Sequence, residues 1–143
     1  MLQYIYSLLI QTTIYHSYDE LKLVLFVDEE EAKDWQFAKW LPHQWTNDKT
    51  FRYYAENAEE LKELSARLET ELSDRFESKD EKAEFSPYYF IICSSHRMLE
   101  KSETIKHLLS LNKNIGVSFV FMMNEIRELP KETQSVIQVE DEV

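Results

Sequence analysis

Blocks of apolar and polar residues alternate along the chain and predict helices and strands in turn. Apolar residues lie on nearly every side of the helical wheel over residues 2–15, which predicts a buried helix. Leucines spaced three or four residues apart predict an amphipathic helix over residues 58–76, opened by a cap at Asn57. Shorter amphipathic stretches predict helices over residues 28–37 and 102–111.

Short apolar runs predict strands over residues 21–27, 50–55, 88–93, 117–122 and 135–139. The first run is almost continuously apolar, which is typical of a strand covered on both faces in a parallel sheet. Alternating strands and helices predict a three-layer α/β sandwich with a mostly parallel sheet. We expect a single domain over residues 1–143. Because a doubly wound domain normally begins with a strand, we also expect this domain to be a fragment of a longer chain.

Composition narrows the function classes. Lys and Arg total 16 and Asp and Glu total 27, so the net charge is −11. Nucleic acids and anionic membranes are bound through basic residues, so both partners are disfavoured. The single glycine, Gly116, cannot build a phosphate-binding loop, which needs several glycines. The single cysteine, Cys93, excludes an internal disulfide and a cysteine-based zinc cluster, and we expect it to be an inert core residue.

Short motifs follow one another along almost the whole chain in a characteristic order: His-Ser-Tyr-Asp-Glu at 16–20, an acidic run at 28–31, Trp-Leu-Pro-His at 40–43 with Trp45, an apolar strand before Ser94-Ser95, and Asn-Ile-Gly-Val at 114–117. In order and spacing these motifs resemble the FtsK/SpoIIIE family of ATPases. Within that family, the resemblance is to the membrane-bound motors of type VII secretion.

The resemblance also implies that catalytic residues of the family are replaced in this chain. The family's Walker B strand ends in Asp-Glu, where this chain has Ser94-Ser95. These carboxylates hold Mg²⁺ and orient the attacking water, and a serine hydroxyl replaces neither. The end of the family's phosphate loop, a Lys-Ser/Thr pair, falls near Leu2. The resemblance therefore implies a degenerate ATPase-like domain with no catalytic residue, metal site or cofactor of its own; ATP and Mg²⁺ would act in other modules of the full-length protein.

Other residues are candidates for contacts with a partner. The aromatic stretch from Trp35 to Trp45 either covers the edge of the sheet or forms a docking surface, since tryptophans dominate interface hot spots. The candidate contacts are Trp35, Trp40, His43 and Trp45. Arg97 follows the most apolar strand and is either solvated or a contact to a neighbouring module. Ser95 beside His96 is better interpreted as a helix cap than as a nucleophile with its base.

The resemblance implies a non-catalytic role at the cytoplasmic face of the membrane of a Gram-positive bacterium. The domain would link upstream membrane spans to active ATPase modules. Its expected partners are those modules, further copies in a homo-oligomer, other secretion components and WXG-type substrates, without nucleic acid. Two alternatives remain open. One is a truncated but active ATP-binding module. The other is an unrelated small α/β binding domain, which a flavodoxin-like strand order without similarity to the ATPases would favour.

Overall fold

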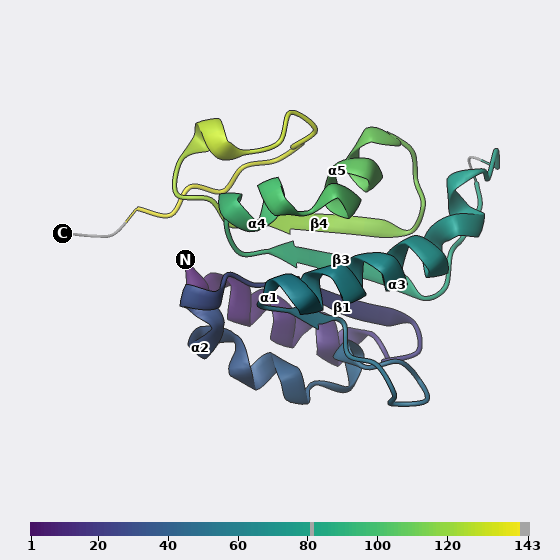
Figure 1. Cartoon of the computed structure of the whole chain (residues 1–143), viewed down its shortest axis with the longest axis horizontal. Coiled ribbons are helices and arrows are strands. Elements are labelled where there is room, and N and C mark those ends of the chain that lie inside the picture. The colour runs from purple at the N-terminus through teal and green to yellow at the C-terminus, as the bar shows by residue number, and fades with distance from the viewer. Residues whose placement is uncertain (81, 141–143) are drawn as a thin grey trace.

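A four-stranded parallel sheet lies between two layers of helices in the computed structural model, which describes residues 1–80 and 82–140 (Figure 1). The strand order is β2-β1-β3-β4, and every pairing is parallel. The strands are β1 (Leu21–Phe26), β2 (Tyr54–Ala55), β3 (Tyr88–Cys93) and β4 (Val117–Phe121). All six residues of β1 are buried, as expected for a strand covered on both faces. The predicted three-layer α/β sandwich is confirmed.

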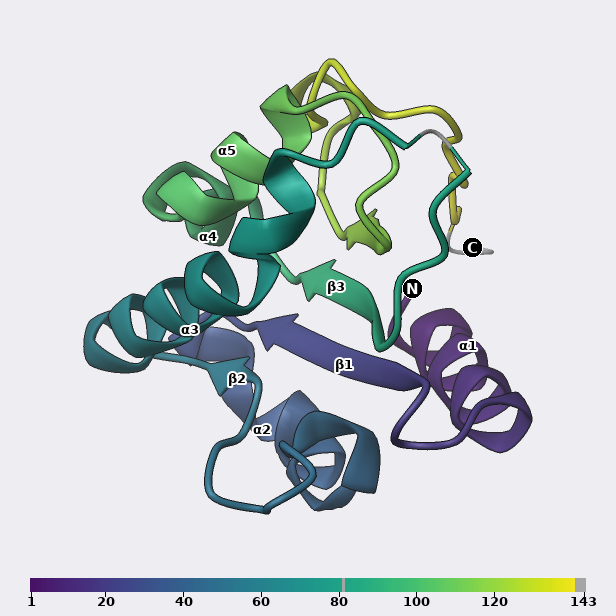
Figure 2. The same ribbon diagram turned by 90° about the vertical axis from the view of Figure 1, so that its right-hand side faces the viewer.

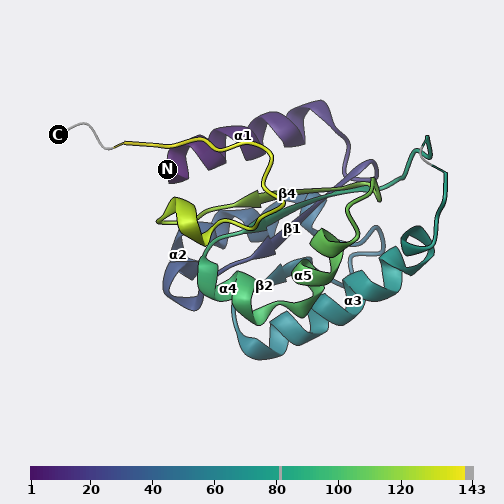
Figure 3. The same cartoon turned by 90° about the horizontal axis from the view of Figure 1, so that it is seen from above.

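The helices are divided between the two faces of the sheet (Figures 2 and 3). One face carries α1 (Leu2–Tyr15), α2 (Ala32–Trp35) and the 3₁₀ turns η1 (Glu29–Glu31), η2 (Gln36–Trp40) and η3 (Pro42–Gln44). The other carries α3 (Ala58–Phe76), α4 (His96–Lys101) and α5 (Glu103–Ser110), and a further 3₁₀ turn, η4 (Ile126–Glu128), follows β4. Each face of the sheet therefore has its own apolar core.

Helix α3 forms as its leucine spacing predicts. The Asn57 side chain accepts a hydrogen bond from the backbone N–H of Glu60 at 3.0 Å and caps the helix. Four leucines at helical spacing are buried against the sheet: Leu61, Leu64, Leu68 and Leu72. Burying each leucine contributes roughly 1.5–3 kcal/mol. The acidic side of the helix faces away from this core, as predicted.

Helix α1 has the predicted bounds but not the predicted environment. Ile5 and Leu9 pack on the sheet, whereas Ile14 and Tyr15 are 72% and 79% exposed. The expectation of a fully buried helix is therefore wrong, because among the described residues only the sheet side of α1 is covered. The outer side of α1 contains no charged residue.

Three other predicted elements also differ. The strand predicted over residues 50–55 shortens to β2. The helix predicted over residues 28–37 divides into η1, α2 and η2. The strand predicted over residues 135–139 is wrong for this structure, because the segment is not paired with another strand among the described residues.

The strand order bears on the open alternatives. The order 2-1-3-4 is the one found at the start of flavodoxin-like sheets, so it meets the first half of the condition for an unrelated α/β binding domain. The second half is the absence of similarity to the secretion ATPases, which the sheet cannot show.

Candidate functional site

The candidate site is a crevice at the carboxyl ends of β1 and β3. The chain steps from β1 to β2 on one side and from β3 to β4 on the other, so the strand order reverses between β1 and β3. Ligands of open α/β sheets bind at such a reversal point. The crevice has a volume of about 310 Å³ and is lined by Glu31, Ser94, Ser95, His96, Arg97, Met122, Asn124 and Glu128.

An ion pair occupies the centre of this edge. Asp28 follows β1 and is buried, and Arg97 lies in the first turn of α4 after β3. The Arg97 Nε donates to Asp28 Oδ2 at 2.8 Å, and a terminal guanidinium nitrogen donates to Oδ1. This two-point contact is the strongest geometry available to an arginine and a carboxylate. Arg97, a candidate for contact with a partner, is therefore already paired within the chain.

Ser94 and Ser95, at the Walker B position of the resemblance, both take part in structural hydrogen bonds. The buried Ser94 Oγ accepts from the backbone N–H of Asp28 at 2.9 Å. The Ser95 Oγ donates to Asp28 Oδ2 at 3.1 Å and accepts from the N–H of Met98 at 3.2 Å, which caps α4. The predicted helix cap at Ser95 is confirmed. Both hydroxyls hold β3 and α4 against the end of β1.

The charges around the crevice are mostly negative. The hydrogen bond from Arg97 lowers the pKa of Asp28, and the Arg97 charge is shared with Glu30 at 3.6 Å. Burial raises the pKa of Glu31, and Glu128 is a further carboxylate in the lining. A triphosphate needs unpaired positive charge. Among the described residues that line the crevice, the one arginine is paired with a carboxylate, and Glu31 and Glu128 are acidic.

Leu2 stands at the start of α1, at the end of the sheet to which the strands point (Figure 1). It is partly buried and packs on the apolar core of that face. An aliphatic side chain supplies neither a positive charge nor a hydroxyl to a phosphate. Among the described residues, no group of three or more His, Cys, Asp or Glu side chains is arranged to hold a metal ion.

The aromatic segment divides between core and surface. Trp35 is fully buried, and His43 is buried with its Nε2 donating to the backbone carbonyl of His16 at 2.8 Å. Trp45 is partly buried, and its Nε1 donates to the carbonyl of Lys39 at 3.1 Å. Trp40 is 86% exposed. Of the four predicted contacts, Trp35 and His43 are thus enclosed by the chain, and Trp40 is the residue open to a partner.

Cys93 ends β3 inside the core. Burial raises the pKa of its thiol to about 12, so the thiolate is scarcely populated at neutral pH. This environment agrees with the inert role expected from the sequence.

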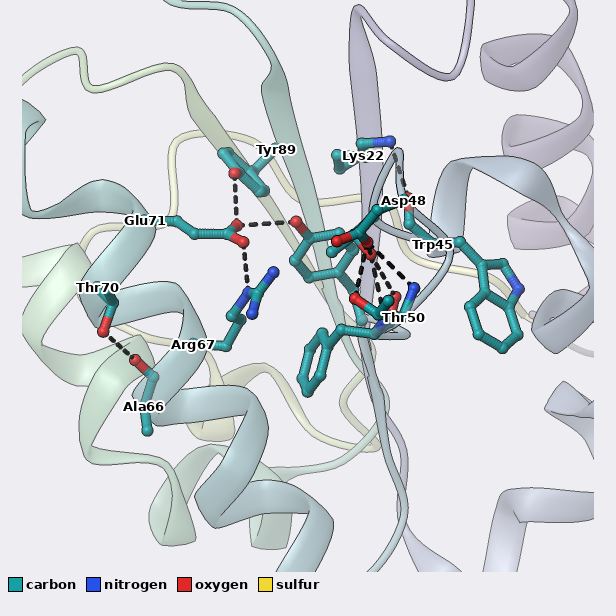
Figure 4. A network of polar contacts seen from close by, with 12 residues as sticks. Lys22, Trp45, Asp48, Thr50, Ala66, Arg67, Thr70, Glu71 and Tyr89 are labelled. Atoms are coloured by element: carbon teal, nitrogen blue, oxygen red, sulfur yellow. Dashed lines mark hydrogen bonds and ion pairs between the residues drawn. The ribbon is translucent and has the colours of Figure 1, made fainter.

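A second polar network lies away from the crevice, between α3 and the sheet (Figure 4). Glu71 Oε2 accepts hydrogen bonds from the hydroxyls of Tyr53 and Tyr89, each at 2.8 Å, and Oε1 accepts from Arg67 Nε at 2.6 Å. Burial raises the pKa of both tyrosines above the ordinary range. These hydrogen bonds tie α3 to β3 through Tyr89 and to the residue just before β2 through Tyr53.

The sequence interpretation missed the role of Asp28, which it placed only in the acidic run at 28–31. The signal was present in the order of elements. Asp28 follows one strand and Arg97 follows another, and the carboxyl ends of neighbouring parallel strands meet at one edge of a sheet.

Removing the Arg97 guanidinium is expected to raise the pKa of Asp28. Because the pKa of Asp28 is lowered in the folded chain, the ion pair stabilises the fold at pH values above the unfolded pKa of about 3.9. This stabilisation is lost as the pH falls through the lower pKa of the folded state. Carbon NMR titration of the Asp28 carboxyl in the Arg97→Ala variant should therefore show a midpoint above that of the unmodified chain. The matched control is Arg127→Ala, since Arg127 is exposed and pairs with Glu125. An unchanged Asp28 midpoint in Arg97→Ala would show that the contact does not form in solution.

Comparison with curated proteins gives relatives that cover most of the chain. The ESX secretion system protein EccC of Geobacillus thermodenitrificans is 24% identical over 129 residues, which are 90% of this chain and 9% of the relative. The ESX secretion system protein YukB of Bacillus subtilis is 27% identical over 81% of this chain and 8% of its own length. The type VII secretion system protein EssC of Staphylococcus aureus is 20% identical over 97% of this chain and 10% of its own length.

The chain thus spans about a tenth of the length of the curated relatives that it matches. No protein family model matches it, and no solved structure gives a significant match. None of the helices in residues 1–80 and 82–140 is both long and apolar enough to cross a membrane. An unrelated α/β binding domain would combine the flavodoxin-like strand order with no similarity to secretion proteins. The strand order is present, but the similarity to secretion proteins goes against this alternative.

Proposed function

We propose that this chain, which is similar to type VII secretion proteins, is a non-catalytic, degenerate ATPase-like segment of the membrane-bound secretion motor. In this role it links membrane spans to active ATPase modules at the cytoplasmic face of a Gram-positive cell. It makes protein contacts while small WXG-type proteins are exported. Its partners are the adjacent modules, further copies of the motor subunit and other secretion components.

The observation that carries the proposal is the Asp28–Arg97 ion pair. It fills the edge of the sheet where an α/β domain would bind a ligand, and among the described residues it uses the only arginine that lines the crevice. Ser94 and Ser95 are hydrogen-bonded to the same Asp28 region, so their hydroxyls serve the fold. A segment built in this way keeps the shape of the sheet end, but the arginine that lines its crevice is already paired.

Trp40 supports the contact role. Its large ring is exposed at the end of η2, and Phe37 on the same turn is 40% exposed. Exposed aromatic side chains that can be desolvated by a partner are typical anchors of protein interfaces. We therefore assign the partner contact to η2 rather than to Trp35 or His43.

Calorimetric titration with Mg·ATP tests the non-catalytic role. We expect no binding heat at micromolar concentrations and no phosphate release, both for this chain and for a polypeptide extended upstream of Met1. The upstream extension is included because it could supply a phosphate loop. Micromolar binding with hydrolysis in either polypeptide would overturn the proposal in favour of an active ATP-binding module.

A further inference from the structure

Strand β4 forms an edge of the sheet with one side of its backbone open. β3 is its neighbour, and all five of its residues are half-buried. The Gly116 carbonyl accepts from the N–H of Tyr89, and the N–H of Met122 donates to the carbonyl of Cys93. Because backbone groups alternate between the two sides of a strand, the N–H groups of Phe119 and Phe121 point to the open side. Such an edge is a template for a further strand.

A groove of about 950 Å³ runs along this edge. Its walls come from β4, the first turns of α1 and the C-terminal segment that includes residues 132–139. Figures 2 and 3 show this segment passing β4 on the side of the sheet that carries α1, and Figure 1 shows it running in the same direction as the strand. No backbone hydrogen bond joins the segment to β4 in the part of the chain that the structure describes.

The segment has the composition of a strand but leaves its apolar side chains in water. Val136, Ile137 and Val139 are 54%, 63% and 42% exposed. Valine and isoleucine favour strands, and residues 135–139 contain no charge or proline. Pairing with β4 would satisfy open backbone groups on both sides and bury part of this apolar surface.

The path of the chain allows that pairing. After β4 the chain passes through η4, and Leu129 packs on the core beneath α3 and α5. The connections from β2 to β3 and from β3 to β4 cross the same face of the sheet and step in the same direction. A parallel strand beside β4 would therefore continue the handedness of the two preceding crossovers, which is the rule for such connections.

We propose that residues 135–139 act as a strap that latches onto the open edge of β4 as a parallel strand and releases from it. The structure shows the released arrangement. Latched, the strap closes the edge to other strands; released, it leaves the edge free. The occupant is this chain's own segment, and the inference does not rest on the secretion role.

Amide hydrogen exchange of the whole chain, followed by NMR, tests the strap. If it latches, the amides of Phe119 and Phe121 exchange about fivefold or more slowly than unprotected backbone, although they face the open side. Successive residues of a strand point their N–H groups to opposite sides, so only one of Val136→Pro and Ile137→Pro removes a donor to β4. We expect one of these variants to abolish the protection and the other to keep most of it.

The amide of Ile91 in β3 serves as the internal control, because its exchange should be the same in all three proteins if the sheet is intact. Two results would overturn the strap. One is unprotected exchange of both Phe119 and Phe121 in the unmodified chain. The other is an equal effect of the two proline variants, which would indicate a general disturbance rather than a ladder.

Discussion

Replacing Trp35 by alanine is expected to lower the free energy of unfolding by about 3–5 kcal/mol, as for other buried tryptophans. The indole is fully buried between the sheet and the helical layer, and it meets the ring of Tyr6 edge-on with centroids 6.1 Å apart. Truncation would leave a cavity that the neighbouring α1 and η2 can fill only in part. Urea denaturation of the purified variant and the unmodified chain measures the difference.

Trp40→Ala is the matched control, because it removes the same side chain from an 86% exposed position. Its free energy of unfolding should stay within about 0.5 kcal/mol of the unmodified chain. Equal losses in the two variants would contradict the division of the aromatic segment into core and surface. Under the proposed function, a loss of export on Trp40→Ala with the fold intact would be due to a lost contact.

Glu71→Ala is expected to lower the free energy of unfolding by about 2–6 kcal/mol, since each of the two buried hydroxyls left without a partner costs about 1–3 kcal/mol. The hydroxyls of Tyr53 and Tyr89 both donate to this carboxylate, and both tyrosines are buried. Arg67 would lose its acceptor as well. Urea denaturation measures the loss, and the hydroxyl proton signals of the two tyrosines should move or broaden in the NMR spectrum.

Two further variants separate the network from the helix that carries it. Glu71→Gln keeps an amide oxygen as acceptor, so it should cost less than Glu71→Ala. Glu63→Ala changes an exposed glutamate of the same helix and should stay within about 0.5 kcal/mol. If Glu71→Ala cost no more than Glu63→Ala, the tyrosine hydroxyls would not depend on the carboxylate.

Much of the fold could be predicted because single elements follow from local spacing. The leucine period and the Asn57 cap define α3, and the nearly unbroken apolar runs define β1 and β3. Alternation of these elements was sufficient for the parallel three-layer arrangement. Residues 135–139 have a strand's local pattern, but pairing depends on a neighbour that no local pattern contains.

The candidate site was only partly predictable. The pattern placed Ser94, Ser95 and Arg97 at the end of a strand, where the structure has them. It did not predict that Asp28 would neutralise Arg97, because that depends on which strands are neighbours. Nor could it separate Trp35 from Trp40, since α2 and η2 are too short for a helical period to assign one side to the core.

The central pairing of β1 with β3 has a consequence for how the chain reaches its fold. Asp28 and Arg97, which close that pairing at one end, are 69 residues apart in the sequence. Because all strand pairings in this sheet are parallel, no hairpin can start it. A large loop must lose conformational entropy by closing before the contacts between β1 and β3 can stabilise the sheet. Helices such as α3 can form locally in microseconds, while the sheet waits for that closure. Refolding should therefore be slow for a chain of this size, because the pairing of β1 with β3 forms late.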